Sequence, residues 1–321
     1  MALGEFDLIA RYFTRPTRRA VLGVGDDCAL LQPTLGQQLA VSSDMLVEGR
    51  HFLSTVAPER LGHKALAVNL SDLAACGAKP MAFMLALALP RPDEAFLAGF
   101  AQGLLALADA HDIELVGGDT TAGPLNLCIT VFGEVPPGQA LRRDGARAGD
   151  GLWVSHPLGG GIGDARLALE VFRGRLHLPG EAFEHVRRAM EQPQPRVALG
   201  LGLRGVASAA IDLSDGLAGD LAHVLRRSHV GATVDLDALP CSAVLAAQSE
   251  TIRRECTAAG GDDYELLFTS ADEAAVRAAA LAAGVGVTRI GRIDAEPGLR
   301  WVNAHGRTIA FQPQGFDHFI D

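Results

Sequence analysis

The stretch ASAAIDLSDGL, residues 207–217, combines the features on which the fold class of this chain depends. Its first part, Ala207 to Ile211, is small or apolar and predicts a short buried strand. An acidic turn with a glycine follows, and Leu217 to Ser228 then places apolar residues at helical spacing. The stretch therefore predicts a strand that passes through an acidic turn into a helix, as in α/β and α+β domains.

The rest of the chain repeats this mixture in both halves. In the first half, the pattern predicts strands at 38–43, 81–89, 115–117 and 126–135, and helices at 58–76 and from 92. In the second half, strands are predicted at 152–154, 233–236 and 265–269, and helices at 164–172, 181–190 and 272–283. Turn residues gather at Pro136-Pro137-Gly138 and from Gly145 to Gly151. We therefore expect two α+β or α/β domains, residues 1–140 and 141–321.

Composition limits the possible functions. The net charge of −10 argues against a nucleic-acid surface, which needs Lys and Arg to neutralise phosphates. No run of about 18 apolar residues predicts a membrane span, and the acidic start lacks a signal-peptide pattern, so we expect an unprocessed cytoplasmic protein. The five cysteines are odd in number and never form C-x-x-C, which indicates neither a disulfide framework nor a zinc site. Lys64 and Lys79 are the only lysines, and neither belongs to a P-loop.

Aspartates recur at the predicted ends of strands. They lie in Gly25-Asp26-Asp27, Ser42-Ser43-Asp44, Gly117-Gly118-Asp119, Asp212-Leu213-Ser214-Asp215-Gly216 and Gly260-Gly261-Asp262-Asp263. Each alone is explained as an ordinary turn, and Asp215 equally well as a helix cap. Asp72 is different, because it lies within a predicted helix and its charge is costly to bury without a partner. Magnesium is held by one or two carboxylates together with substrate phosphates, so the set favours a magnesium and phosphate site.

Two further features stay open at this point. The segment Gly159–Gly163 does not give G-x-G-x-x-G with an acid about 20 residues later, so a dinucleotide site and a flexible substrate loop are both weakly indicated. The histidines form no H-E-x-x-H motif, which disfavours catalytic zinc. His51, just after the Asp44 segment, is the one histidine kept as a candidate.

The acidic motifs in this order resemble the thiamin-monophosphate kinase family, within the superfamily of aminoimidazole ribonucleotide synthetase. The resemblance also rests on AVNLSDLA at 67–74, GGDDYEL at 260–266 and GFDHF at 315–319. It implies an α+β sheet domain that pairs with a second subunit to form a homodimer, followed by an α/β domain that completes the substrate site. It also implies ATP-dependent conversion of thiamin monophosphate to thiamin diphosphate with several Mg²⁺ ions.

The resemblance assigns roles to individual residues. The implied magnesium ligands are Asp27, Ser42, Ser43, Asp44, Asp72, Asp119, Asp212 and Asp215. The implied nucleotide contacts are Gly118, Asp119, Arg143 and Ser214. The implied contacts to thiamin monophosphate are His51, Asp262 and Phe316. The family usually has Glu at the position of Asp262, and often Tyr or Trp at that of Phe316.

No general base is expected, because the nucleophile is a phosphate oxygen that is largely ionised at neutral pH. Catalysis then depends on positioning and on neutralising charge. One alternative is a sister enzyme with another acceptor, such as formylglycinamidine ribonucleotide or selenide. A non-catalytic magnesium-nucleotide binding module is a second. A metal-dependent phosphatase is a third, disfavoured because no D-x-D-x-[TV] string occurs.

Overall fold

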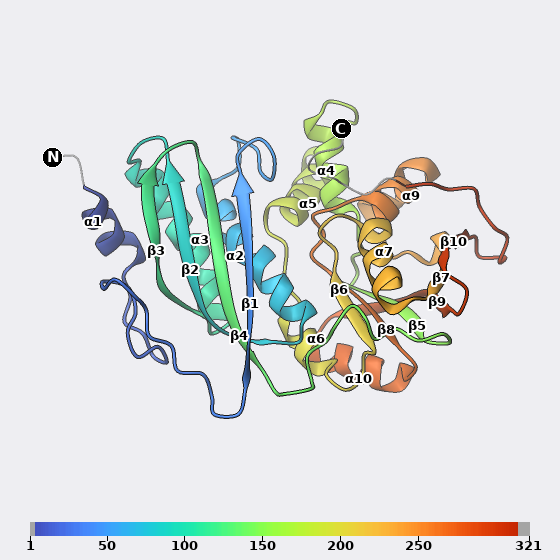
Figure 1. Cartoon of the computed structure of the whole chain (residues 1–321). Helices are drawn as coiled ribbons and strands as arrows, with labels where there is room; N and C mark the ends of the chain where they lie inside the picture. Colours follow the sequence, from blue (N-terminus) through green and yellow to red (C-terminus); the bar gives the residue numbers. More distant parts are fainter. Residues whose placement is uncertain (1–3, 314–321) are drawn as a thin grey trace. The chain divides into compact units, whose positions relative to one another are not determined.

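The computed structural model describes residues 4–313 and divides the chain into two compact units (Figure 1). The first unit contains the residues up to Leu73 and Ala78–Gly138, and the second contains Ala74–Gly77 and the residues from Gln139 onward. The first unit ends at Gly138, and the sequence prediction divides the chain after residue 140. The grouping of Ala74–Gly77 with the second unit has no signal in the sequence.

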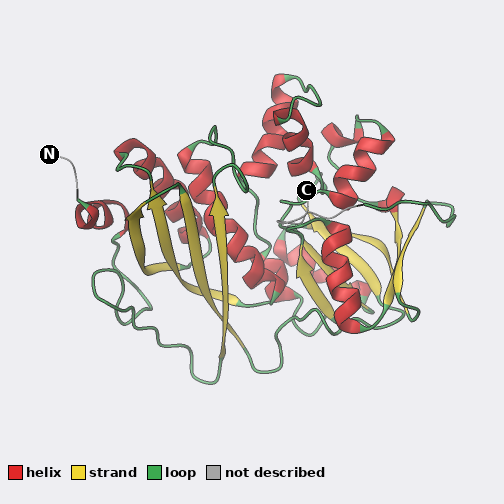
Figure 2. Cartoon of the chain, turned by 45° about the horizontal axis from the view of Figure 1, so that its top comes forward, coloured by secondary structure: helices red, strands yellow, loops and turns green. Residues whose placement is uncertain are grey.

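A four-stranded mixed sheet forms the first unit, with strand order β1-β4-β2-β3. Its strands are β1 (Gln38–Val47), β2 (Lys79–Leu89), β3 (Glu114–Ala122) and β4 (Asn126–Val135). Helices α2 (Pro58–Ala75) and α3 (Glu94–Ala110) cover one face, as Figures 1 and 2 show. Leu66 and Leu70 of α2 and Phe100 and Leu104 of α3 are fully buried beneath it. Two short elements, α1 (Glu5–Leu8) and η1 (Ile9–Phe13), precede this sheet.

Two of the acidic segments predicted as turns lie inside strands, and that prediction was wrong. β1 continues through Ser43 and Asp44 to Val47, and each of its residues is paired with β4. β3 likewise continues through Gly118 and Asp119 to Ala122, paired with β2. Asp and Gly have low strand propensity, but pairing with a neighbouring strand overrides such local preferences.

A six-stranded mixed sheet forms the second unit, in the order β10-β7-β9-β5-β8-β6. Its strands are β5 (Gly151–His156), β6 (Ala209–Asp212), β7 (Gly231–Asp235), β8 (Leu266–Ser270), β9 (Gly286–Asp294) and β10 (Gly298–Val302). Its helices are α4 (Asp164–Phe172), α5 (Gly180–Glu191), α6 (Val197–Gly202), α7 (Leu217–Ser228), α8 (Ala243–Ala246), α9 (Glu250–Ala259) and α10 (Glu273–Ala283), and η2 (Leu236–Ala238) is a single 3₁₀ turn.

The core of the second unit joins α7 to the sheet. Leu221 of α7, Val154 of β5 and Ile211 of β6 belong to one buried cluster, and all are at most 2% exposed. A separate apolar cluster joins α4, α5, α8 and α9. No helix among residues 4–313 has both the length and the apolar character needed to cross a bilayer.

Candidate functional site

The first group of predicted residues lies between β1 and α2. Alternation along β1 turns Ser42 and Asp44 toward the helix, where the Ser42 hydroxyl donates a hydrogen bond to Oδ2 of Asp72. The backbone N–H of Asp44 donates to Oδ1 of Asn69 at 3.1 Å, and Asn69, 1% exposed, donates in turn to the carbonyl of Ala65. The structure therefore brings Ser42, Asp44 and Asp72 together in one half-buried polar row.

Ser43 points to the opposite face of the sheet. Its hydroxyl oxygen lies 3.0 Å from Oγ1 of Thr130 and 3.3 Å from Sγ of Cys128, both on β4. The Ser43 side chain is thus separated from Ser42 and Asp44 by the sheet itself, and its role as a magnesium ligand stays a prediction.

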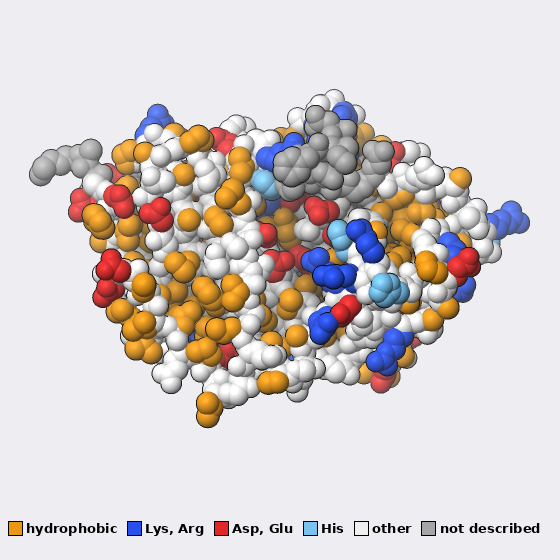
Figure 3. Space-filling model, in the orientation of Figure 1, with side chains coloured by type: hydrophobic (Ala, Val, Ile, Leu, Met, Phe, Trp, Pro, Cys, Tyr) orange, Lys and Arg blue, Asp and Glu red, His pale blue; other side chains and the backbone are white. Residues whose placement is uncertain are grey.

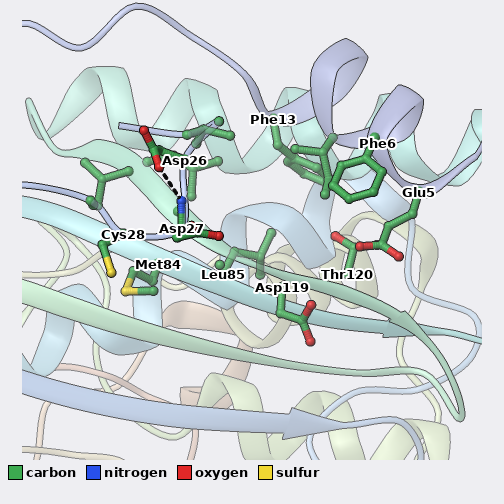
Figure 4. A pocket seen from close by; sticks show the side chains of 18 residues that line it. Glu5, Phe6, Phe13, Asp26, Asp27, Cys28, Met84, Leu85, Asp119 and Thr120 are labelled. Atoms are coloured by element: carbon green, nitrogen blue, oxygen red, sulfur yellow. Dashed lines mark hydrogen bonds between the residues drawn. The ribbon is translucent and has the colours of Figure 1, made fainter. Parts of the chain in front are cut away.

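Asp27, Gly118 and Asp119 line a pocket of about 520 Å³ in the first unit. Figure 4 shows the Asp26-Asp27 segment over Leu85 and Asp119, with the Asp27 N–H donating to Oδ1 of Asp26 at 2.8 Å. Gly118 has φ +146°, and a Cβ there would lie 1.8 Å from the carbonyl oxygen of Leu85. The position therefore requires glycine, which lets β3 approach β2 closely beside the pocket.

Apolar side chains form the other wall of this pocket. Phe6 and Phe13 come from the N-terminal helical elements, and Met84 comes from β2 (Figure 4). Phe6 is 81% exposed. The pocket thus combines carboxylates with an aromatic wall, an arrangement that suits a ligand with a flat apolar part and a charged part.

The second group of predicted residues lies where β6 passes into α7. Asp212 ends β6 and is 4% exposed, and the segment from Ser214 to Gly216 leads into the helix. Gly216, at φ +102°, makes the turn. Asp212, Ser214 and Asp215 are therefore placed together at the amino end of α7, where free N–H groups and the helix dipole favour phosphate oxygens.

Asp220, in the first turn of α7, belongs to this group and was missed by the sequence prediction. It is 3% exposed, and its carboxylate accepts the backbone N–H of Asp215 at 3.1 Å. Burial first, and then the nearby carboxylates of Asp212 and Asp215, raise its pKa to about 8. A signal was available, since Asp220 interrupts the apolar stripe that Leu217 begins.

Arg143, a predicted nucleotide contact, lies in the same region. Its positive charge lowers the pKa of Asp220, against the larger effect of burial that raises it. It also lowers the pKa of His223, after the larger effects of burial and Arg226. Its backbone carbonyl accepts the hydroxyl of Ser228, at the end of α7, at 2.9 Å. The structure thus places a cationic side chain beside the acidic turn. A site that binds phosphate oxygens needs such a cation.

The loop after α9 contacts this turn directly. The N–H of Asp262 donates to the carbonyl of Ser214 at 2.9 Å, and the N–H of Tyr264 donates to that of Leu213 at 2.8 Å. Asp262 and Tyr264 have φ of +69° and +51°, a region that residues other than glycine rarely adopt. Such backbone strain is concentrated at functional sites, so the predicted substrate contact Asp262 lies in a strained loop beside Ser214.

The remaining predicted contacts lie elsewhere. His51 follows β1, and its Nδ1 accepts the N–H of Val47 at 3.0 Å, so the ring is held beside the end of that strand. Phe316 lies outside the described residues.

The donor sets are chemically suited to magnesium. Within residues 4–313, no three His, Cys, Asp or Glu side chains converge closely enough to hold a metal ion by themselves. Magnesium usually takes one or two carboxylates and completes its shell with water and phosphate oxygens. Ser42 with Asp72 offers such a partial set. In the second unit, Asp212 and Asp215 raise the pKa of Asp220 after the larger effect of burial, and a divalent cation beside these acids would lower it.

Comparison with known proteins gives the family. Residues 25–135 match the N-terminal domain, and residues 147–302 the C-terminal domain, of AIR synthase related proteins. The thiamine-monophosphate kinase of Salmonella typhimurium is 45% identical, with 99% of each chain covered. The crystal structure of thiamine-monophosphate kinase from Stenotrophomonas maltophilia has a TM-score of 0.83 at 46% identity, covering 92% of this chain and 94% of that one.

A third relative carries ligands. AaThiL complexed with AMPPCP and TMP has a TM-score of 0.76 at 28% identity, covering 90% of this chain and 89% of that one. The two AIR synthase related domains, the identity over nearly the whole length and the shared structure agree, and the chain belongs to the thiamine-monophosphate kinase family.

Proposed function

We propose that the chain transfers the γ-phosphoryl group of ATP to the phosphate of thiamin monophosphate, giving thiamin diphosphate and ADP. The observation that carries the proposal is the acidic turn at the start of α7, with Arg143 beside it and the strained Asp262 loop hydrogen-bonded to Ser214. It joins a cation, helix N–H groups and carboxylates in one place. Relatives named thiamine-monophosphate kinase, and a relative complexed with AMPPCP and TMP, support the choice of substrates.

The residues would act by binding and orientation. Arg143 and the Ser214 hydroxyl would hold phosphate oxygens of the nucleotide, and Asp262 would orient the acceptor. The attacking phosphate oxygen has a second pKa of about 6 and needs no base. Bound at the Asp sets, magnesium would supply charge neutralisation for two polyanions that must approach in line. We assign its ligands to Asp27, Ser42, Asp44, Asp72, Asp119, Asp212 and Asp215, and keep Ser43 as a weaker candidate.

We further propose that the open face of the first sheet pairs with a second copy of the chain. Leu39, Val41, Met45 and Val47 alternate along β1 and are 38% to 58% exposed. Figure 3 shows hydrophobic side chains gathered over the strands of this unit. A contiguous apolar face of this kind is typical of a protein interface, and a two-fold dimer would bury the same face on both copies.

We place the protein in the cytoplasm. The five cysteines are free thiols in the described part of the chain, which accords with a reducing compartment.

The test of the activity is a direct assay. Protein, ATP, Mg²⁺ and thiamin monophosphate are incubated, and thiamin diphosphate and ADP are measured by chromatography. We expect the two products in equal amounts. The variant Asp119→Asn should lose activity, while Asp109→Asn, which removes a surface carboxylate of α3 in the same unit, should keep it. Folded protein that binds ATP yet forms no thiamin diphosphate would contradict the proposal and favour another acceptor.

A further inference from the structure

The glycine-rich segment Gly159–Gly163 is built into the second unit and is not an open phosphate loop. The N–H of Gly160 donates to the carbonyl of Pro157, and that of Ile162 donates to the carbonyl of Pro240. Ile162 is fully buried in the core. A Cβ at Gly161 would lie 2.2 Å from Cα of Cys241. The N–H groups of Gly160 and Ile162 are thus already engaged within the unit, and Gly161 serves close packing.

The last glycine of this segment is bound by a carboxylate from another loop. Gly163 caps α4 at φ +90°, and its N–H donates to both oxygens of Asp263, at 2.8 and 3.0 Å. A Cβ at Gly163 would lie 2.7 Å from the carbonyl carbon of Cys256 in α9. The contact therefore ties the start of α4 to the loop that follows α9.

The surroundings of Asp263 are energetically unfavourable for a carboxylate. As a residue it is partly exposed, but its carboxyl group is enclosed by protein. Burial first, and then the charges of Glu265, Asp164 and Asp262, raise its pKa well above the ordinary value. An acid surrounded by other acids costs stability, which indicates a role other than stability.

Its neighbours in sequence suggest that role. Asp263 lies between Asp262 and Tyr264, the two residues of this loop that have positive φ. The hydroxyl of Tyr264 donates to Oδ1 of Asp262 at 3.1 Å, and so fixes the carboxylate of Asp262. The side chain of Asp263 binds the N–H of Gly163 and so anchors the loop between these two residues. Without it the strained backbone could relax, and the direction of the Asp262 side chain would change.

We propose that Asp263 is a positioning residue, which holds Asp262 in its acceptor-binding orientation by gripping the N–H of Gly163. The proposal rests on the function proposed above and assigns the Gly159–Gly163 segment to acceptor specificity. Its effect is exerted through Asp262 and not through contact with the nucleotide.

The test compares three variants with the wild type. Asp263→Ala removes both acceptor oxygens, and we expect it to raise KM for thiamin monophosphate about 10-fold to 100-fold, because small misplacements of binding groups have effects of this size. KM for ATP should change less than about 3-fold. Asp263→Asn keeps one of the two acceptor oxygens, so it should raise KM for thiamin monophosphate by only about 3-fold to 10-fold. The control, Asp272→Ala, removes an Asp-to-amide bond of 2.9 Å at the start of α10 and should lower only thermal stability.

The outcomes separate the two proposals. Wild-type protein that forms no thiamin diphosphate contradicts the proposed function itself. Active wild type with a selective rise in KM for thiamin monophosphate supports the role of Asp263. An unchanged KM, or equal rises for both substrates, overturns that role. If Asp263→Ala does not fold, Asp263→Asn decides: a selective rise of about 3-fold to 10-fold supports the role, and an unchanged KM overturns it.

Discussion

Replacing Arg196 by Met should destabilise the second unit strongly, because it leaves a buried carboxylate without its counter-charge. The Arg196 and Glu265 side chains are 10% and 5% exposed. Arg196 Nε donates to Oε2 of Glu265 at 2.7 Å, its terminal nitrogen donates to Oε1, and the buried hydroxyl of Ser155 also donates to Oε2. Breaking a buried pair from one side costs about 3–5 kcal/mol, since the remaining charge stays desolvated.

The size of the effect follows from burial, and a second pair in the same unit tests this. Arg142 and Asp144 form the same two-bond fork, but their side chains are 70% and 41% exposed. Water screens such a pair, so Arg142→Met should cost far less stability than Arg196→Met. The double variant Arg196→Met, Glu265→Leu should recover most of the loss, because neither charge of the pair remains.

The assay is urea unfolding followed by circular dichroism, with thermal midpoints as a second measure. For a unit of this size, the Arg196→Met loss corresponds to a midpoint lower by about 10 °C. A loss no greater than that of Arg142→Met would refute the reasoning. A double variant as unstable as Arg196→Met would also refute it, because the cost would then come from lost packing and not from the buried Glu265 carboxylate.

Four further predictions concern the proposed site and the open face. Gly118→Ala should cost more than about 2 kcal/mol in urea unfolding, because a Cβ would meet a β2 carbonyl, whereas Gly138→Ala, with free space around it, should lose less. In the presence of a chelator, the free energy of unfolding of Asp220→Asn should equal that of the wild type below pH 3.8. At pH 7 the variant should be more stable by about 4 kcal/mol, as urea unfolding at a series of pH values would measure. The folded pKa of about 8 makes the wild type lose stability as the pH rises from 3.8 toward 8, at 1.36 kcal/mol per unit. Asp72→Asn should lower kcat about 100-fold at saturating Mg²⁺ while the unfolding midpoint changes little; wild-type turnover would exclude it as a ligand. Val41→Glu should elute as a monomer in light-scattering chromatography.

Much of the fold was predictable because its strongest elements have clear periodicity. The helix at Leu217–Ser228, the helix at Asp164–Phe172 and the strand at Asn126–Val135 have the predicted bounds. β9 and α9 were missed, because β9 mixes Gly, Arg and Asp with few buried residues, among them Ile290 and Ile293. Such a strand is stabilised by pairing with distant strands, which local sequence does not encode.

The sequence proposes candidate site residues along the chain but does not give their arrangement in three dimensions. The acidic segments do mark where polar groups gather, and the grouping of Asp212, Ser214 and Asp215 is present at the start of α7. Asp220 was missed because its importance comes from burial beside two other acids. A local reading assigns an acid in the first turn of a helix to solvent or to the helix dipole.

One cause explains both why the strand predicted at 38–43 was shorter than β1 and why Ser43 was grouped with the predicted magnesium ligands. A segment read as a turn gives no reason to separate adjacent residues, so Ser42, Ser43 and Asp44 all enter the same ligand set. The same segment within a strand alternates, and every second residue turns to the other face. β1 obeys this rule, with Ser42 and Asp44 toward α2 and Ser43 beside Thr130 on the open face. Because Ser43 shares that face with the exposed Val41 and Met45, its hydroxyl lies on the surface proposed for dimerisation. Ser43→Ala should therefore disturb subunit pairing more than magnesium affinity, and chromatography beside a magnesium titration would distinguish the two.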